Sequence, residues 1–317
     1  MPTFIRDLIK PAAELPQADV AFVGLPLDAG TVLEGGRAGA TEAPDAIRSE
    51  LRRYHKTYNL EYDVDLQRLR LADAGNLDLT SPEHTENHER IRQQVSALLF
   101  QYPKVVVFGG SHDGTYSTVR GLCDMAEQPG GGLNIDAHAD VKNKPEISSG
   151  TPFGKLLREG FVLGKHFTEI GLHSNLNAKE DIDFLRKQNA KIITLADVFE
   201  NGIEGYVEHA LNRAVAAGGP VFVSLDLDSL AQAFAPGVSA PSSDGLTPRH
   251  AVQAAFLAGR HPAVRLFEVV ELNPRYDRDN QTARLAATIV TAYLTGVAVA
   301  LAKLPPLEHH HNRLAHG

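Results

Sequence analysis

The sequence predicts an α/β protein built around a mostly parallel sheet, and three observations support this class. Short apolar runs rich in β-branched residues recur along the chain. Segments with helical periodicity lie between these runs. The runs are apolar at successive positions, which is typical of parallel strands that are covered on both faces. We therefore expect helices on both sides of the sheet.

Six runs are predicted strands, and three intervening segments are predicted helices. The strands are Val20–Leu25, Val105–Phe108, Leu133–Ile135, Lys191–Leu195, Val221–Leu227 and Val264–Val270, and the helices are Ile91–Phe100, Tyr206–Ala217 and His250–Gly259. The uncharged segment Leu285–Ala302 is long enough to span a bilayer. Its many Ala, Thr and Gly residues favour instead a helix buried against the sheet. No linker interrupts the pattern, which predicts a single domain over residues 1–317 with short flexible termini.

Bulk composition restricts the class of partner and the compartment. The formal net charge of −8 argues against a general nucleic-acid binder, which needs basic surface to neutralise phosphates. A single cysteine, Cys123, rules out an intrachain disulfide and fits a reducing compartment. The N-terminal segment lacks the apolar stretch of a secretory signal. We expect a cytoplasmic protein that acts on a small molecule, without nucleic-acid or membrane partners.

Polar clusters follow four of the predicted strands, where ligands of open α/β sheets bind. The candidate side chains are His112, then Asp136, His138 and Asp140, then Asp226 and Asp228, and finally Glu271. If the strand before Asp136 continued, the alternation of side chains would place Asp136, His138 and Asp140 on one side. All four clusters are expected at the same edge of the sheet.

Four carboxylates and two imidazoles in the first three clusters predict a metal site. This ligand set suits Mn²⁺ or Mg²⁺, and six ligands exceed the needs of one tetrahedral ion. Two ions could share a water and lower its pKa toward neutrality. Taken singly, an Asp after a strand is more often a cap or turn residue, and His112 could be a hydrogen-bonded loop histidine. Together, unpaired burial of so many acids would cost several kcal/mol, so cations are the better interpretation.

Four motifs, in this order and at these separations, resemble those of the ureohydrolase superfamily, which includes arginases, agmatinases and formimidoylglutamases. They are GGSHD from Gly109, NIDAHAD from Asn134, SLDLDSL from Ser224 and ELNP from Glu271. Together with GGRAGATEAPDAIR from Gly35, the resemblance extends from about Val20 to Ala300. It implies one arginase-like three-layer α/β/α domain, two Mn²⁺ ions per subunit, and a homo-oligomer, either a trimer or a hexamer.

The resemblance also implies roles for individual residues. One manganese would be held by His112, Asp136, Asp140 and Asp226, and the other by Asp136, His138, Asp226 and Asp228. Glu271 is similar to the family's carboxylate that grips the cationic amidine or guanidine of the substrate. Independently, an acid at a strand end can accept two N–H groups at once, although Glu271 could instead cap the turn before Pro274.

The branch of the family is predicted from four places in the chain. Arginases and agmatinases carry a His-Gly pair shortly after the DAHAD-type motif, whereas Phe153 precedes Gly154 here. The stretch SSGTPF, Asp113 in GGSHD, the segment EGGRAGATEAPDAIR and APGVSAP are similar to the formimidoylglutamase branch. This branch hydrolyses the C–N bond of N-formimidoyl-L-glutamate to L-glutamate and formamide in histidine degradation. The alternative is a guanidino hydrolase that releases urea: an agmatinase, an arginase or a guanidino-acid hydrolase.

The predicted substrate carries a cationic amidine and two carboxylates, so cationic or N–H donors are expected opposite Glu271. Lys142 lies two residues beyond Asp140, on the same side if the backbone is a strand, and Arg37 lies in a glycine-rich loop. Either could instead be a solvated surface residue, and the branch tends to have arginine at the position of Lys142. Further predicted contacts are Ser149, Thr151 and Asn175.

Proton transfer is assigned to two candidate residues. Asp140 could accept the proton of the attacking water and pass it to the leaving amine. His173, in Gly171-Leu172-His173-Ser174-Asn175, is a substitute for the arginase-type histidine or a substrate contact, and could equally be a loop histidine without a role.

Two hypotheses from other functional classes of protein stay open at this point. A catalytically silent metal-binding relative would be expected to have lost ligands, yet all six are present. A nucleotide-binding protein built on Gly109-Gly110 or Gly130-Gly131-Gly132 lacks the glycine spacing and the lysine of the known phosphate-binding loops.

Overall fold

The computed structural model describes residues 3–303, apart from the side chain of Tyr54. Most of the two termini that we expect to be flexible therefore lies outside the described residues. Within the described range a nine-stranded sheet has the order β1-β5-β2-β6-β11-β10-β7-β8-β9, and its pairings are parallel. The strands are β1 (Ile9–Pro11), β2 (Val20–Leu25), β5 (Leu71–Asn76), β6 (Val105–Gly109), β7 (Gly130–Ile135), β8 (Val162–Leu172), β9 (Lys191–Thr194), β10 (Val221–Asp226) and β11 (Val264–Val270). A separate antiparallel pair joins β3 (Tyr58–Asn59) to β4 (Val64–Asp65).

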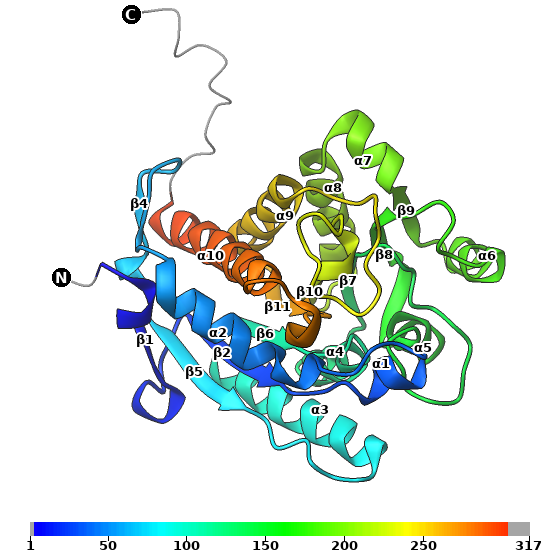
Figure 1. Cartoon of the computed structure of the whole chain (residues 1–317), viewed down its shortest axis with the longest axis horizontal. Coiled ribbons are helices and arrows are strands. Elements are labelled where there is room, and N and C mark those ends of the chain that lie inside the picture. The colour runs from blue at the N-terminus through cyan, green and yellow to red at the C-terminus, as the bar shows by residue number, and fades with distance from the viewer. Residues whose placement is uncertain (1–2, 304–317) are drawn as a thin grey trace, which may run out of the picture.

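Helices cover both faces of this sheet, which confirms the predicted α/β class with helical outer layers (Figure 1). One face is covered by α2 (Ala43–Tyr54), α7 (Leu195–Asn201), α8 (Glu204–Val215), α9 (Pro248–Arg260) and α10 (Gln281–Ala302). The other face is covered by α3 (His84–Gln101), α4 (Gly114–Cys123), α5 (Pro152–Arg158) and α6 (Lys179–Lys187). The short α1 (Ala29–Leu33) follows β2. Short 3-10 helices span Ile5–Asp7, Ala12–Glu14, Ala40–Glu42, Leu66–Arg68, Leu227–Ser229 and Pro274–Tyr276.

The predicted strands are all present, with small shifts at their ends. Val20–Leu25 and Val264–Val270 have the predicted bounds. Lys191–Leu195 ends one residue early because Thr194 caps α7, its hydroxyl accepting from the backbone N–H of Asp197. Strands β1, β5 and most of β8 were not predicted, since sequences such as LADAGN in β5 are weakly apolar.

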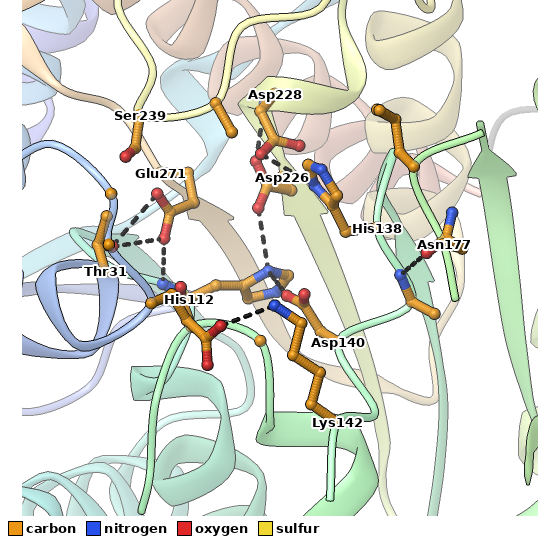
Figure 2. A pocket seen from close by; sticks show the side chains of 18 of the residues that line it. Thr31, His112, His138, Asp140, Lys142, Asn177, Asp226, Asp228, Ser239 and Glu271 are labelled. Carbon is orange, nitrogen blue, oxygen red and sulfur yellow. Dashed lines mark hydrogen bonds and ion pairs between the residues drawn. The ribbon is translucent and has the colours of Figure 1, made fainter. Parts of the chain in front are cut away.

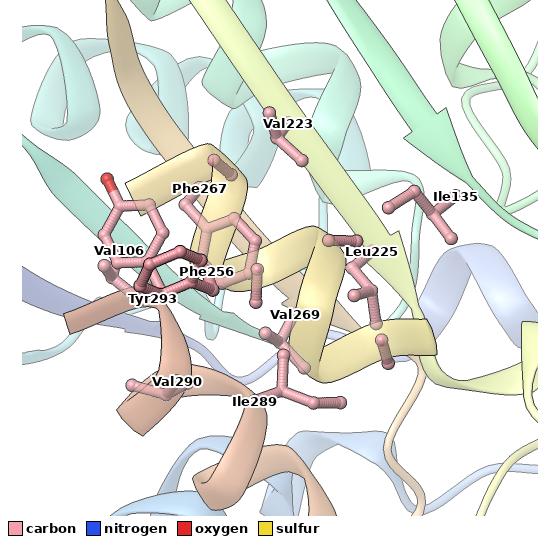
Figure 3. Packing of buried hydrophobic residues seen from close by; sticks show 14 of the residues in the cluster. Val106, Ile135, Val223, Leu225, Phe256, Phe267, Val269, Ile289, Val290 and Tyr293 are labelled. Carbon is pink, nitrogen blue, oxygen red and sulfur yellow. The ribbon is translucent and has the colours of Figure 1, made fainter. Parts of the chain in front are cut away.

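The core between the sheet and α9 and α10 contains the apolar segment that could be mistaken for a membrane span. Helix α10 is apolar and long enough to cross a bilayer, yet 67% of its most apolar 18-residue stretch is buried in the protein. The Tyr293 ring stacks on Phe267 of β11 at 4.4 Å between centroids (Figure 3). The approach of α9 is so close that a Cβ on Gly259 would lie 2.0 Å from the Tyr293 carbonyl oxygen. Helix α10 is thus a buried core helix, as expected.

The strand order places the polar clusters next to one another. Strands β6, β11, β10 and β7 are consecutive neighbours and run in parallel, so their carboxyl ends share one edge. The residues that follow these ends are His112, Glu271, Asp228 and Asp136, respectively. Segments more than a hundred residues apart in the chain therefore meet at one place. The division of the chain into one domain stays a prediction.

Candidate metal centre

Three carboxylates surround one nitrogen of His112 at the carboxyl edge of the sheet. The Nδ1 atom lies 3.2 Å from Asp136 Oδ2, 3.0 Å from Asp140 Oδ2 and 3.0 Å from Asp226 Oδ2. Figure 2 shows His112, Asp140 and Asp226 pointing toward one another from different elements. The other ring nitrogen, Nε2, is 3.0 Å from the hydroxyl of Ser224, which orients the imidazole.

A second group lies beside the first and shares Asp136 with it. His138 Nδ1 is 3.3 Å from Asp228 Oδ2 and 3.6 Å from Asp136 Oδ1. The ligand atoms of each group lie within 4.8 Å of one another, a spacing that one cation per group can bridge. Backbone N–H groups hold two of these acids in place: that of His138 donates to the shared Asp136 at 2.7 Å, and that of Asp228 donates to Asp226 at 2.7 Å.

The two groups together form a cage of six side chains, and its charges fit divalent cations better than protons. These side chains are His112, Asp136, His138, Asp140, Asp226 and Asp228. Although three carboxylate oxygens approach it, His112 Nδ1 has no hydrogen bond of acceptable geometry among the described residues, and neither has Asp228 Oδ1. Burial and repulsion from Asp228 and Asp136 raise the pKa of Asp226 well above its usual value. Burial and the charge of Asp136 likewise raise the pKa of Asp140 to about 6. Cations would offset this repulsion and occupy the lone pairs that hydrogen bonds leave unused.

The backbone that carries Asp136, His138 and Asp140 is not a strand, contrary to our expectation. Strand β7 ends at Ile135, and the segment after it is irregular. Asp140 has a φ of 48°, in the left-handed region that few non-glycine residues adopt. The three side chains meet through this turn of the chain, and not through the alternation of a pleated strand.

Glu271 lies at the end of β11 with its carboxylate next to the cage. It accepts hydrogen bonds from the backbone N–H of His112 at 2.7 Å and from the Thr31 hydroxyl at 3.1 Å. Its φ of 65° is again left-handed, which turns the side chain toward the cavity (Figure 2). Burial and repulsion from Asp228 raise the pKa of Glu271 to about 8. A cationic substrate group would relieve this repulsion, so the position suits an amidine or guanidine.

The cage opens into a cavity of about 370 Å³ that contains eight of the predicted site residues. They are His112, His138, Asp140, Lys142, Ser149, Asp226, Asp228 and Glu271. Asp136 lies beneath them, fully buried. Lys142 reaches the cavity although the strand geometry used to predict its direction is absent.

Four other predicted residues do not line this cavity. The Arg37 guanidinium donates to the carbonyl oxygens of Ser239 and Val238 and lies over the Tyr276 ring. Thr151 is buried in a turn with Ser148, and Asn175 is exposed. The predicted substrate contacts of Arg37, Thr151 and Asn175 stay predictions that the geometry does not support.

His173, the fourth, is buried beside the cavity. Its Nδ1 is 3.3 Å from the Ser242 hydroxyl, and its Nε2 has no hydrogen-bond partner among the described residues. Its role in proton transfer therefore stays a prediction.

Glu34 and Asn177 are among the cavity residues that were not predicted. Glu34 accepts from Lys142 at 2.7 Å and Lys144 at 2.9 Å. Burial opposes its ionisation, but hydrogen bonds from Lys142, Ser148 and Lys144 prevail and lower the pKa of Glu34 to about 2. Asn177 accepts from the Ala139 backbone N–H at 2.7 Å and so holds the turn beyond β7. Neither residue belongs to a metal-ligand motif, so the sequence offered no signal for them.

The parallel α/β sheet and the two ligand groups at its carboxyl edge together define a protein with a binuclear metal centre. The chain belongs to the arginase family, whose family model matches residues 18–296. It is therefore a metal-dependent hydrolase of the class that acts on linear amidines and guanidines.

Individual relatives agree with this assignment. A formimidoylglutamase of Halalkalibacterium halodurans is 29% identical over 282 residues, which cover 88% of this chain and 87% of the relative. A guanidinobutyrase of Pseudomonas aeruginosa is 29% identical over 288 residues and covers 89% of this chain and 87% of its own length. A crystal structure of Trypanosoma cruzi formiminoglutamase with Mn²⁺ has a TM-score of 0.83 and 32% identity, covering 89% of this chain and 94% of that one.

Proposed function

We propose that this protein hydrolyses N-formimidoyl-L-glutamate to L-glutamate and formamide, a step of histidine degradation. The observation that carries the proposal is the pair of charged ends in the cavity. Glu271 supplies a carboxylate for the cationic amidine, and Lys142 supplies an ammonium for a substrate carboxylate. Lys144 binds the same Glu34 as Lys142 and adds a second positive charge nearby. Formimidoylglutamate has this combination of one amidine and two carboxylates.

Phe153 supports the same choice. It stands where the arginase-type histidine is expected, and it is 1% exposed. Its ring lies nearly perpendicular to that of His112, at 5.3 Å between centroids, and stacks on Phe167 at 5.1 Å. An apolar ring at this position cannot transfer a proton. The proton donor must therefore be another residue in or near the cavity.

The metal ligands would be the six side chains predicted from the motifs, with Mn²⁺ as the proposed ion. Bound divalent cations polarise water and make it a nucleophile near neutral pH. Glu271 orients the amidine by accepting from its nitrogens, which points the amidine carbon toward the cage. Glu271 itself is buried, and this charge-assisted contact is stronger in a buried site than in bulk water.

Asp140 is the group that we assign to proton transfer. Its carboxylate faces the cage at the bottom of the cavity, next to His112 (Figure 2). It would take the proton lost by the attacking water and deliver it to the nitrogen of glutamate as the C–N bond breaks. His173 is the second candidate, because its Nε2 is unpartnered, but its side chain does not line the cavity.

A substrate panel on Mn²⁺-loaded protein tests the proposal. Formamide should appear from N-formimidoyl-L-glutamate, with little urea from arginine, agmatine or 4-guanidinobutyrate. Asp226→Asn, which removes a ligand charge, serves as the inactive control. Release of urea from a guanidino compound at a higher kcat/KM than formamide would contradict the proposed substrate while leaving the metal centre intact.

A guanidino-acid hydrolase is the second candidate, and one observation favours it. Glu34 and Asp181 both line the cavity near Lys142 and balance the positive charge there. A nearly neutral rim suits a substrate with one carboxylate better than one with two, and the guanidinobutyrase relative acts on such a compound by its name. The cytoplasmic location and the homo-oligomer stay predictions.

A further inference from the structure

A second cluster of possible metal ligands lies outside the cavity, beneath the loop that carries His112. It consists of His84 and His88 on the first two turns of α3 and Asp113, the residue after His112. Asp113 is fully buried and His88 is 1% exposed, whereas the side chain of His84 is 21% exposed. The cluster is therefore closed on the protein side and reachable from solvent through His84.

Four ligand-type atoms crowd together in this cluster. His84 Nε2 and His88 Nε2 are 3.1 Å apart. Asp113 Oδ2 lies 3.3 Å from the first nitrogen and 3.0 Å from the second. The carbonyl oxygen of Ile147 is 2.9 Å from His84 Nε2. Ligands of a tetrahedral ion with bonds of about 2.05 Å lie about 3.3 Å apart, so these spacings are close to those of a zinc site.

With hydrogen bonds alone, each pattern of protons on the two imidazoles leaves a close contact between like groups or an unpaired ring nitrogen. If both Nε2 atoms carry protons, they can donate to the Ile147 carbonyl oxygen and to Asp113, but the two donor nitrogens then lie only 3.1 Å apart and His84 Nδ1 stays unpaired. If His84 Nε2 is bare, its lone pair faces the oxygen lone pairs of Asp113 and Ile147. If only His88 Nε2 is bare, its lone pair faces Asp113 at 3.0 Å. One cation between the four atoms would satisfy them all at once.

Two further contacts point the same way. His88 Nδ1 lies 2.8 Å from the Ser117 hydroxyl, and a proton on Nδ1 donated to Ser117 leaves Nε2 free as a ligand. Asp113 Oδ1 is buried and has no hydrogen-bond partner among the described residues. Such an unpaired, fully buried carboxylate oxygen is costly unless a cation neutralises the group. His84 Nδ1, which would carry the ring proton when Nε2 binds a cation, is buried and has no hydrogen-bond partner among the described residues.

We propose that His84, His88 and Asp113 form a separate site for a third divalent cation, with the Ile147 carbonyl oxygen as a fourth ligand. Two imidazoles and a single carboxylate make zinc the better match, in contrast to the oxygen-rich cage. The site is independent of the proposed substrate, since none of its residues lines the cavity.

The ion would hold three segments of the cavity wall together. It would connect α3, the loop Gly109–Asp113 that carries His112, and the loop that places Ser149 at the cavity. Gly30 closes the remaining side, since a Cβ there would lie 2.1 Å from the Asp113 carboxyl carbon. The cation would thus act as a structural support for the metal centre.

Counting cations tests this site. Wild-type protein, His84→Ala, His88→Gln and the control His209→Ala are dialysed against Mn²⁺ with added Zn²⁺, and bound metal per chain is measured by elemental analysis. His209 is an exposed histidine on α8 and controls for adventitious binding. Wild type and His209→Ala should hold one more equivalent than His84→Ala and His88→Gln. Zn²⁺ should also raise the Tm of the Mn²⁺-loaded wild type but not that of the two variants.

Equal cation counts in all four proteins would overturn the proposal, as would a wild type that binds two cations and no more. If His88→Gln does not fold, His84→Ala decides, because its side chain is partly exposed and its loss is tolerated more easily. Absence of formimidoylglutamate hydrolysis would contradict the proposed function and would leave the third cation, and this test of it, unaffected.

Discussion

Replacing Lys142 with methionine tests how the cavity recognises a carboxylate. Methionine keeps much of the length of the side chain and removes the charge. Glu34 would still be held by Lys144 and Ser148, so the rim should keep its structure. The substitution therefore changes recognition more than folding.

The size of the effect follows from charge and exposure. Two unit charges about 4 Å apart interact by about 4 kcal/mol at an effective dielectric constant of about 20. The Lys142 side chain is 48% exposed and shares its charge with Glu34, so solvent and Glu34 screen the attraction. A remaining contribution of about 1–2 kcal/mol corresponds to about 5- to 30-fold in kcat/KM.

The assay compares two substrates and two variants. For Lys142→Met, kcat/KM should fall about 5- to 30-fold for N-formimidoyl-L-glutamate and by less than about 2-fold for a formimidoyl alkylamine without carboxylates. Lys179→Met is the matched control, because Lys179 also pairs with a carboxylate, Asp183, but lies outside the cavity. An equal loss for both substrates, or none for either, would refute the assignment of Lys142 to carboxylate binding.

Three further substitutions test the metal centre, the core and the cavity rim. Asp226→Asn should lower kcat by about 1,000-fold, which corresponds to a loss of about 4 kcal/mol of transition-state stabilisation. It should also reduce the Mn²⁺ content found by elemental analysis, and full activity would contradict the two-cation centre. Phe153→Ala should reduce the free energy of unfolding in urea by about 3–5 kcal/mol, whereas Phe199→Ala, at an exposed position, should change it by about 0.5 kcal/mol or less. Because the pKa of Glu34 is lowered from 4.5 to about 2 in the fold, its contribution to stability is present above pH 4.5 and is lost as the pH falls toward 2. In chelator-treated protein, Glu34→Gln should therefore reduce the free energy of unfolding by about 1 kcal/mol at about pH 6 and by less at about pH 3. The expected loss is small because solvent screens the partly exposed lysines, and a difference that did not change with pH would count against the ion pairs.

The strands that carry the site could be predicted because burial on both faces leaves a strong signal. Val264–Val270 is apolar at nearly every position, and the structure gives it the same bounds. The edge strand β1, three residues long and mostly exposed, has no such signal. β1 pairs with β5, about sixty residues further along the chain, and the local sequence does not record this long-range contact.

In the turn beyond β7, the sequence correctly predicted that three side chains meet, but for the wrong structural reason. The motif DAHAD correctly indicated that Asp136, His138 and Asp140 come together. The alternation of a strand was the wrong reason, since Asp140 is left-handed and Asn177, from a distant segment, holds this turn. A positive φ and a remote hydrogen bond cannot be inferred from residue spacing.

By itself, the sequence determined the class of fold and the family, and it predicted the candidate metal ligands that the structure gathers at one edge of the sheet. These depend on residue type and order, which local hydrophobicity and motif spacing record directly. Tertiary structure alone decided that Glu34 pairs with Lys142, that the Arg37 guanidinium binds backbone carbonyls instead of lining the cavity, and that Asp113 meets two histidines of α3. Such contacts join segments far apart in the chain, and their geometry exists only once the sheet has brought its strand ends together.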